Sequence, residues 1–202
     1  ILFALIGLSF ASCKKTEEDK SATMVLNFKH QINNSEIVFD EIKYTNSFGN
    51  NYSVSTLKYF ISNVNLKKSD GSMVLLSDYI YIDGADNTTS SISIVDLALG
   101  DYESISFVFG LNEEDNISNK FLNPPENNMV WPEPMGGGYH YMKLEGKFDS
   151  TDLVKNYQAH TGRLMENPHF INIDLKFDAP FSLVSNEDII LNNVSWKIKT
   201  GK

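Results

Sequence analysis

Cysteine, basic residues and long apolar runs are all scarce in this chain of 202 residues. A single cysteine excludes an internal disulfide. With 17 Lys and Arg against 26 Asp and Glu, the net charge is −9, and no basic cluster offers the surface that nucleic acids require. The chain also lacks the CxxC and HExxH spacings of zinc sites, the GxSxG motif and a phosphate loop after a strand. These absences exclude nucleic-acid partners and the commonest catalytic sites.

The apolar start of the chain indicates a targeting segment. Residues Ile1 to Ala11 are uncharged and apolar, but they are too few to cross a bilayer. The small residues before Cys13 resemble the lipobox of bacterial lipoproteins, in which the signal is cleaved before a cysteine that is then lipidated. We therefore expect a truncated signal peptide over residues 1–12 and a lipidated tether over residues 13–23. The alternative is that Cys13 is a buried free cysteine in a core strand.

A lipid on Cys13 would anchor the domain without spanning the membrane. The tether is polar, charged and without periodicity, which is typical of a flexible linker. We expect an extracytoplasmic protein held at the bacterial outer membrane, on its periplasmic or its surface face.

Beyond the tether, apolar residues recur with a period of two and predict strands. A hydrophobic fraction of 42% is typical of a folded globular domain. About nine short strands without a repeat or an internal linker predict an all-β fold, a single antiparallel β-sandwich over residues 24–202. The expected strands cover residues 23–30, 53–67, 73–76, 79–83, 91–95, 102–110, 139–148, 170–177, 189–191 and 194–198, with a hairpin turn at Asp70-Gly71.

Two segments do not fit the strand pattern. Asn112 to Val130 is polar and carries Pro124-Pro125, so we expect a long ordered loop of the kind that often has a function. Ser150 to Asn167 is the only place where we expect a short helix, so the sandwich should have long loops and at most one short helix.

Six motifs follow one another along the chain: Phe28-Lys29-His30; Leu57 to Leu66 before Asp70-Gly71; Phe107 to Gly110 before an Asn-rich loop; Met129-Val130-Trp131; Gly138 to Gly146; and His160-Thr161-Gly162. In this order and at this spacing, they resemble the MbnP-like family of copper-associated secreted proteins. The resemblance covers roughly residues 24–180. It implies a β-sandwich that binds copper through histidines and, in some members, carries a tryptophan oxidised to kynurenine.

Carried over motif by motif, the resemblance implies His30 and His160 as copper ligands and Trp131 as the modified residue. It also implies a partner, a secreted dihaem oxidase of the cytochrome c peroxidase type. The segment after Trp131, Pro132 to Met135, departs from the commonest family pattern. That departure bears on the tryptophan chemistry more than on the fold.

The residues themselves leave alternatives open at each of these positions. Imidazole and thioether ligands suit copper, yet scattered histidines are more often surface or hydrogen-bonded residues. His140 is expected as a half-buried strand residue on the side of Met142, and His169 as a loop residue. Trp131 is either a rim residue open to oxidation or a hydrophobic plug.

Three functions follow from these patterns. The leading hypothesis is a lipid-anchored, non-enzymatic copper-handling sandwich. A surface module that recognises glycans or proteins is the second, and exposed aromatic clusters without converging histidines would favour it. A hydrolase is the third, supported by abundant carboxylates alone.

Overall fold

The computed structural model describes residues 21–150, 153–183 and 188–197, and for the last of these segments the backbone alone. Twelve strands and three short 3₁₀ helices make up these residues. The predicted signal peptide and Cys13 lie outside them. No helix among the described residues is long and apolar enough to cross a membrane.

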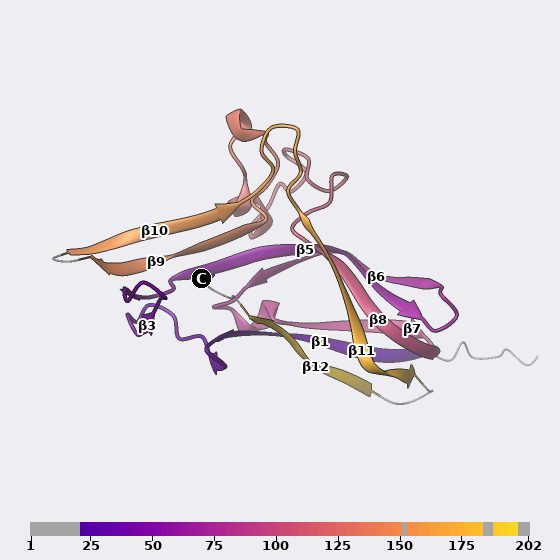
Figure 1. Cartoon of the computed structure of the whole chain (residues 1–202). Coiled ribbons are helices and arrows are strands. Elements are labelled where there is room, and N and C mark those ends of the chain that lie inside the picture. Colours follow the sequence, from indigo (N-terminus) through magenta and orange to yellow (C-terminus); the bar gives the residue numbers. More distant parts are fainter. Residues whose placement is uncertain (1–20, 151–152, 184–187, 198–202) are drawn as a thin grey trace, which may run out of the picture.

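The strands form two sheets that face each other across a common core (Figure 1). The smaller sheet has the order β12-β1-β2, with β7 beside β1. The larger has the order β11-β8-β5-β9-β4-β3, with β6 beside β5 and β10 beside β9. The strand bounds are β1 Ser21–Ile32, β2 Ser35–Glu36, β3 Tyr44–Thr45, β4 Asn51–Tyr52, β5 Thr56–Lys68, β6 Met73–Asp83, β7 Ser91–Ala98, β8 Gly100–Phe109, β9 Met142–Ser150, β10 Leu153–Thr161, β11 Ile171–Leu183 and β12 Asp188–Lys197.

The fold class expected from the sequence is confirmed, an all-β sandwich. The strand pairings are antiparallel except that of β1 with β12, which is parallel. The chain passes from the larger sheet to the smaller between β11 and β12, so no hairpin fixes the direction of β12. Strand β1 begins at Ser21, so the last three residues of the predicted tether belong to the sheet.

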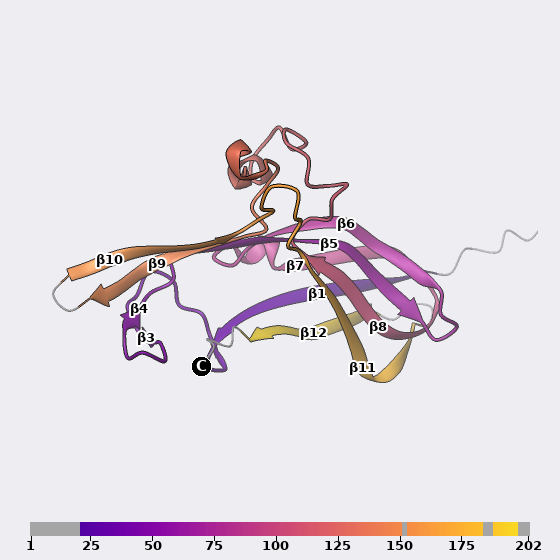
Figure 2. The same cartoon turned by 45° about the horizontal axis from the view of Figure 1, so that its top comes forward.

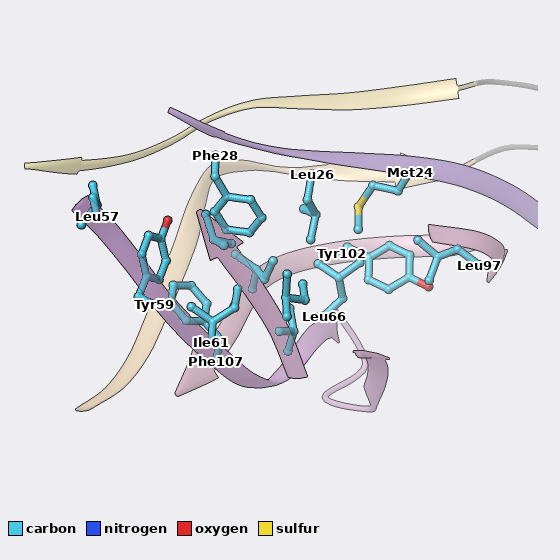
Figure 3. Packing of buried hydrophobic residues seen from close by; sticks show 14 of the residues in the cluster. Met24, Leu26, Phe28, Leu57, Tyr59, Ile61, Leu66, Leu97, Tyr102 and Phe107 are labelled. Atoms are coloured by element: carbon cyan, nitrogen blue, oxygen red, sulfur yellow. The ribbon is translucent and has the colours of Figure 1, made fainter. Parts of the chain in front are cut away.

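Alternating side chains of β1 build the core, as the period of two predicts. Met24, Leu26 and Phe28 are buried and point toward β5 of the larger sheet (Figure 3). On β5, Leu57, Tyr59 and Ile61 face them, followed after an irregularity at Asn63 by Val64 and Leu66. Asn63 has a φ of 50°, and this bulge restores the inward face of the strand.

The predicted helix within Ser150–Asn167 is wrong. That segment contains β10, which pairs along its length with β9. The β9–β10 hairpin extends beyond the body of the sandwich (Figure 2). The described helical turns lie in loops instead, at Asn87–Thr89, Glu126–Met129 and Glu133–Met135.

Candidate metal centre

The long loop predicted after β8 folds onto the outer face of the larger sheet. Its residues join β5 and β6 in a second cluster of buried side chains. The cluster consists of Phe60, Tyr81, Leu111, Met129, Tyr139 and Tyr141. Asn116 fixes the loop, because its Oδ1 accepts from the Tyr139 N–H at 2.8 Å and its Nδ2 donates to the Tyr141 hydroxyl at 3.2 Å. The loop therefore buries the middle of the outer face of β5, around Phe60.

The strand register places His160 on this outer face. His160 lies opposite Lys143 of β9, which in turn lies opposite Lys58 of β5. Residues paired directly across a sheet share a face, while their neighbours along the strand point to the other. Met142 and Leu144, next to Lys143, accordingly pack into the core between the sheets.

His140 is buried beside His160, at the point where the loop enters β9. The two ring centroids are 4.8 Å apart and the rings are nearly perpendicular, at 88°. His140 thus lies on the face opposite to Met142, and the expectation that it shares the side of Met142 is wrong. The strand begins only at Met142, so its alternation does not extend back to His140.

A backbone carbonyl orients the His140 ring. The Met129 carbonyl oxygen lies 2.6 Å from the His140 backbone nitrogen and 3.0 Å from Nδ1. Since a carbonyl only accepts, Nδ1 carries the proton and Nε2 keeps its lone pair. Burial lowers the pKa of His140 to about 4, although the bond to the Met129 carbonyl opposes the shift. The ring is therefore neutral at physiological pH.

A carboxylate orients the His160 ring. Nε2 lies 2.6 Å from Glu145 Oε1, and both side chains are partly buried on the outer face of the hairpin. Donation from Nε2 to the carboxylate leaves Nδ1 as the nitrogen with a lone pair. An imidazole whose other N–H is held by a carboxylate or a carbonyl is the usual arrangement of a metal-binding histidine.

Trp131 completes a row of three rings. Its centroid is 4.6 Å from that of His140, at an interplanar angle of 87°, and its side chain is only 7% exposed. The indole N–H points to the Met135 carbonyl at 3.4 Å. A Cβ at Gly162 would lie 2.8 Å from Trp131 Cδ2, so the indole packs directly on the backbone there. Trp131 is thus buried in the protein, as the hydrophobic-plug interpretation predicts.

The structure does not bring His30 and His160 together. His30 Nε2 lies 2.9 Å from the hydroxyl of Tyr59, whose side chain belongs to the core between the sheets. His160 lies on the other face of that sheet. Burial lowers the pKa of His30, partly offset by Asp83. His169 lies exposed in a loop, as expected.

Sequence reasoning missed the partnership of His140 with Trp131, although a signal exists. Between them stand Gly136, Gly137 and Gly138, all with positive φ. This turn folds the chain back, so that the Trp131 N–H donates to the Gly138 carbonyl at 2.8 Å. Three successive glycines between two ring-bearing residues thus indicate a reversal that brings the rings together.

His140 and His160 are the two histidines whose rings meet in the part of the chain that the structure describes. Among the described residues, no group of three or more His, Cys, Asp or Glu side chains is arranged to hold a metal ion. A lone pair on Nε2 of neutral His140 and one on Nδ1 of His160 fit a metal that accepts few imidazole ligands, and copper is such a metal. Zinc sites, which use four ligands or three plus water, fit this pair poorly.

The model of the MbnP family matches residues 21–198. The chain belongs to the MbnP family. Among solved structures, MbnP from Methylosinus trichosporium is similar, with a TM-score of 0.56 and 12% identity over 79% of this chain and 72% of that one. At this identity the likeness shows a shared fold. No curated protein matches the chain. The family expected from the six motifs is confirmed.

Proposed function

We propose that this MbnP-family chain is a copper-handling extracytoplasmic protein that binds copper through His140 and His160. One observation carries the proposal: the two rings lie 4.8 Å apart, each with one nitrogen fixed by a neighbouring oxygen. Membership of a copper-associated family supports the choice of metal. The ligand pair expected from the sequence is thereby revised, since His160 remains and His140 takes the place of His30.

The chemistry of the pair favours Cu(I). Both ligands are imidazoles, and Cu(I) is stable with a small number of nitrogen or sulfur donors. His140 stays neutral at physiological pH because burial lowers its pKa, so copper need not displace a proton from it. The Met129 carbonyl and Glu145 hold the rings in place before the metal arrives, which reduces the entropy lost on binding.

The proposed role is non-enzymatic and tied to a membrane by a lipid. The lipobox-like sequence before Cys13 supports the anchor, and the polar stretch that follows supports a tether. An anchored domain with a small metal site suits storage or delivery of copper at the outer membrane. In that role copper is the cargo of the protein.

We extend the proposal to oxidation of Trp131 to kynurenine by a dihaem oxidase of the cytochrome c peroxidase type. The contact between Trp131 and His140 supports it, since the new carbonyl and amine would arise beside the imidazoles. Two molecules of peroxide, reduced to water at the partner's haems, would accept four electrons from the indole. Water would supply the two oxygen atoms that open the pyrrole ring, the four protons released would go to the reduction of the peroxide, and hydrolysis would release the C2 carbon as formate. Because Trp131 is 7% exposed, oxidation would proceed by electron transfer from the buried indole to the partner.

The recognition module is the less favoured alternative. It requires a cluster of exposed aromatic rings, and Phe48 is the only exposed aromatic side chain among those that the structure describes. The converging histidines of the outer face also count against it.

Cu(I) titration in competition with a chromophoric chelator tests the proposal. His140→Ala and His160→Ala should each lower the affinity at least about 100-fold, because one imidazole cannot hold the ion alone. His30→Ala and His169→Ala are the matched controls and should bind like the wild type. Equal affinity in all five proteins, or a loss in the His30→Ala variant alone, would reject the assignment.

A further inference from the structure

A cavity of about 400 Å³ opens on the opposite face of the β9–β10 hairpin from the histidine pair. It lies at the end of the sandwich, where the hairpin extends over the segment that contains β3 and β4 (Figures 1 and 2). Its volume falls within the range of small-molecule sites in proteins. The lining residues come from β1, from residues 33–54 and from the hairpin.

Aliphatic and aromatic side chains form the walls. Leu144, Phe148 and Tyr157 lie on the inner face of the hairpin. Tyr157 shares that face because it pairs with Gly146, which stands between Leu144 and Phe148 in the alternation of β9. Tyr52 meets the Tyr157 ring edge to face, with centroids 6.4 Å apart. Val54 is buried beneath them. Such walls suit a flat apolar ring system.

None of the described residues that line the cavity is ionised at physiological pH. Burial raises the pKa of Tyr52 and raises that of Tyr157 to about 12, so both phenols are neutral. The Tyr157 hydroxyl donates to the Ser53 carbonyl at 2.9 Å. A charged ligand would lose its hydration here without gaining a counter-ion from the described lining residues, so an uncharged ligand is favoured.

Amide groups stand at the rim. Asn33, Asn46 and Asn50 line the opening, and Asn46 Oδ1 already accepts from the backbone N–H groups of Phe48 and Asn50. A few polar groups around apolar walls are the usual composition of a site that orients a neutral ligand.

We propose that this cavity binds an uncharged aromatic small molecule of two or three rings. The volume, the aromatic walls and the absence of charge among the described lining residues together define this chemical class. The site is separate from the copper site, because its walls point to the other face of the hairpin from His160. The proposal is therefore independent of the proposed function.

Two dyes with one scaffold test the charge selectivity. N-phenyl-1-naphthylamine is neutral, and 1-anilinonaphthalene-8-sulfonate is the same ring system with a sulfonate. The neutral dye should bind the wild-type protein at one site with a rise in fluorescence. The sulfonate should bind at least about tenfold more weakly, because none of the described lining residues offers a charge that would replace its hydration. Equal binding of both dyes, or no binding of the neutral one, would overturn the proposal.

A pair of identical substitutions locates the dye. Asn50→Trp should fill the opening and weaken the neutral dye at least about tenfold. Asn156→Trp is the control, since Asn156 is exposed and lies opposite Lys147 on the outer face of the same hairpin. Thermal unfolding would check that both variants fold.

A measurement on the unaltered protein guards against a misfolded variant. Nuclear Overhauser contacts from the neutral dye should reach the rings of Phe148 and Tyr157. Contacts elsewhere, or the same dye affinity in the two Trp variants, would reject this site. His140→Ala should leave dye binding unchanged, so loss of the copper function and loss of this site can be told apart.

Discussion

His160 and Glu145 lie diagonally across the β9–β10 pair, with Nε2 and Oε1 2.6 Å apart. Each residue stands two positions along its strand from the residue that lies directly opposite the other. The contact therefore depends on the pairing of the two strands rather than on the loops. His140 takes its orientation from a loop carbonyl instead. The orientation of His160 therefore depends on strand pairing, and the orientation of His140 depends on the loop.

Glu145→Gln should weaken Cu(I) binding by about 10- to 100-fold without unfolding the protein. The amide can still accept from Nε2, but it loses the charge that makes the imidazole a stronger donor. Glu103→Gln is the control, because Glu103 pairs with Lys67 at 2.6 Å on the surface of the larger sheet. Competition titrations of both variants give the comparison, and equal affinities would count against a metal-orienting role for Glu145.

The unfolding free energy should fall as the pH drops from about 6.5 to about 4, in part because of His140. Its pKa is lowered in the folded protein, so over this window the unfolded chain takes up a proton that the folded chain does not. The stabilisation that comes from the lowered pKa of His140 is fully present above pH 6.5. It is lost as the pH falls through the folded pKa, and it amounts to at most about 3 kcal/mol.

Denaturant unfolding of apo-protein across this pH range measures the effect. His140→Asn keeps an amide N–H for the Met129 carbonyl and does not titrate, so its curve should be flatter than that of the wild type. His30 and the carboxylates titrate in both proteins. Parallel curves would mean that His140 does not contribute.

Gly162→Ala should displace Trp131. The new Cβ would stand 2.8 Å from Cδ2 and 3.0 Å from Cε2 of the indole, and relief of such overlap costs about 1–3 kcal/mol. Tryptophan fluorescence should shift to longer wavelength as water reaches the ring. Gly49→Ala is the control for contact with the indole. Its φ of 84° makes the backbone strained with alanine, but its Cβ would meet nothing within 4 Å, so the emission should stay unchanged.

Gly71→Val should destabilise the protein by about 1–2 kcal/mol. Gly71 stands at the tip of the β5–β6 hairpin with a φ of 88°, which a β-branched residue resists. Gly71→Asn should cost less, because asparagine tolerates the left-handed region. Chemical denaturation of the three proteins would show this order, and a fully stable valine variant would refute it.

Cys13→Ser should release the full-length protein from membranes, because the proposed anchor is the lipid on that cysteine. Fractionation of cells that express both forms gives the answer. Persistent membrane association of the serine variant would contradict the lipoprotein interpretation.

The sequence predicted the parts of the fold where one face of a strand meets the core. Alternation located β1 and β11, and Asp70-Gly71 located the turn between β5 and β6. The sequence did not predict strand β10. Residues such as Leu153 and Val154 are exposed on a projecting hairpin, where burial imposes no alternation of apolar and polar residues.

Local sequence patterns also fail to predict which side chains meet at the candidate site. The motif around His160 predicts that residue as a ligand. The position of His140 beside it depends on the register of β9 with β10 and on the path of a long loop. A shift of one residue in that register would have turned His160 inward. No periodicity within either segment carries that information.

Strand β5 pairs with β6 through a tight turn, but with β8 and β9 only across long stretches of intervening chain. Closing long loops is slow relative to forming local hairpins. We therefore expect β5 and β6 to pair early in folding, and β9, which carries Glu145 and follows His140, to join them late. The proposed copper ligands therefore come together only when β9 has joined the larger sheet, so the proposed site requires that sheet to be assembled.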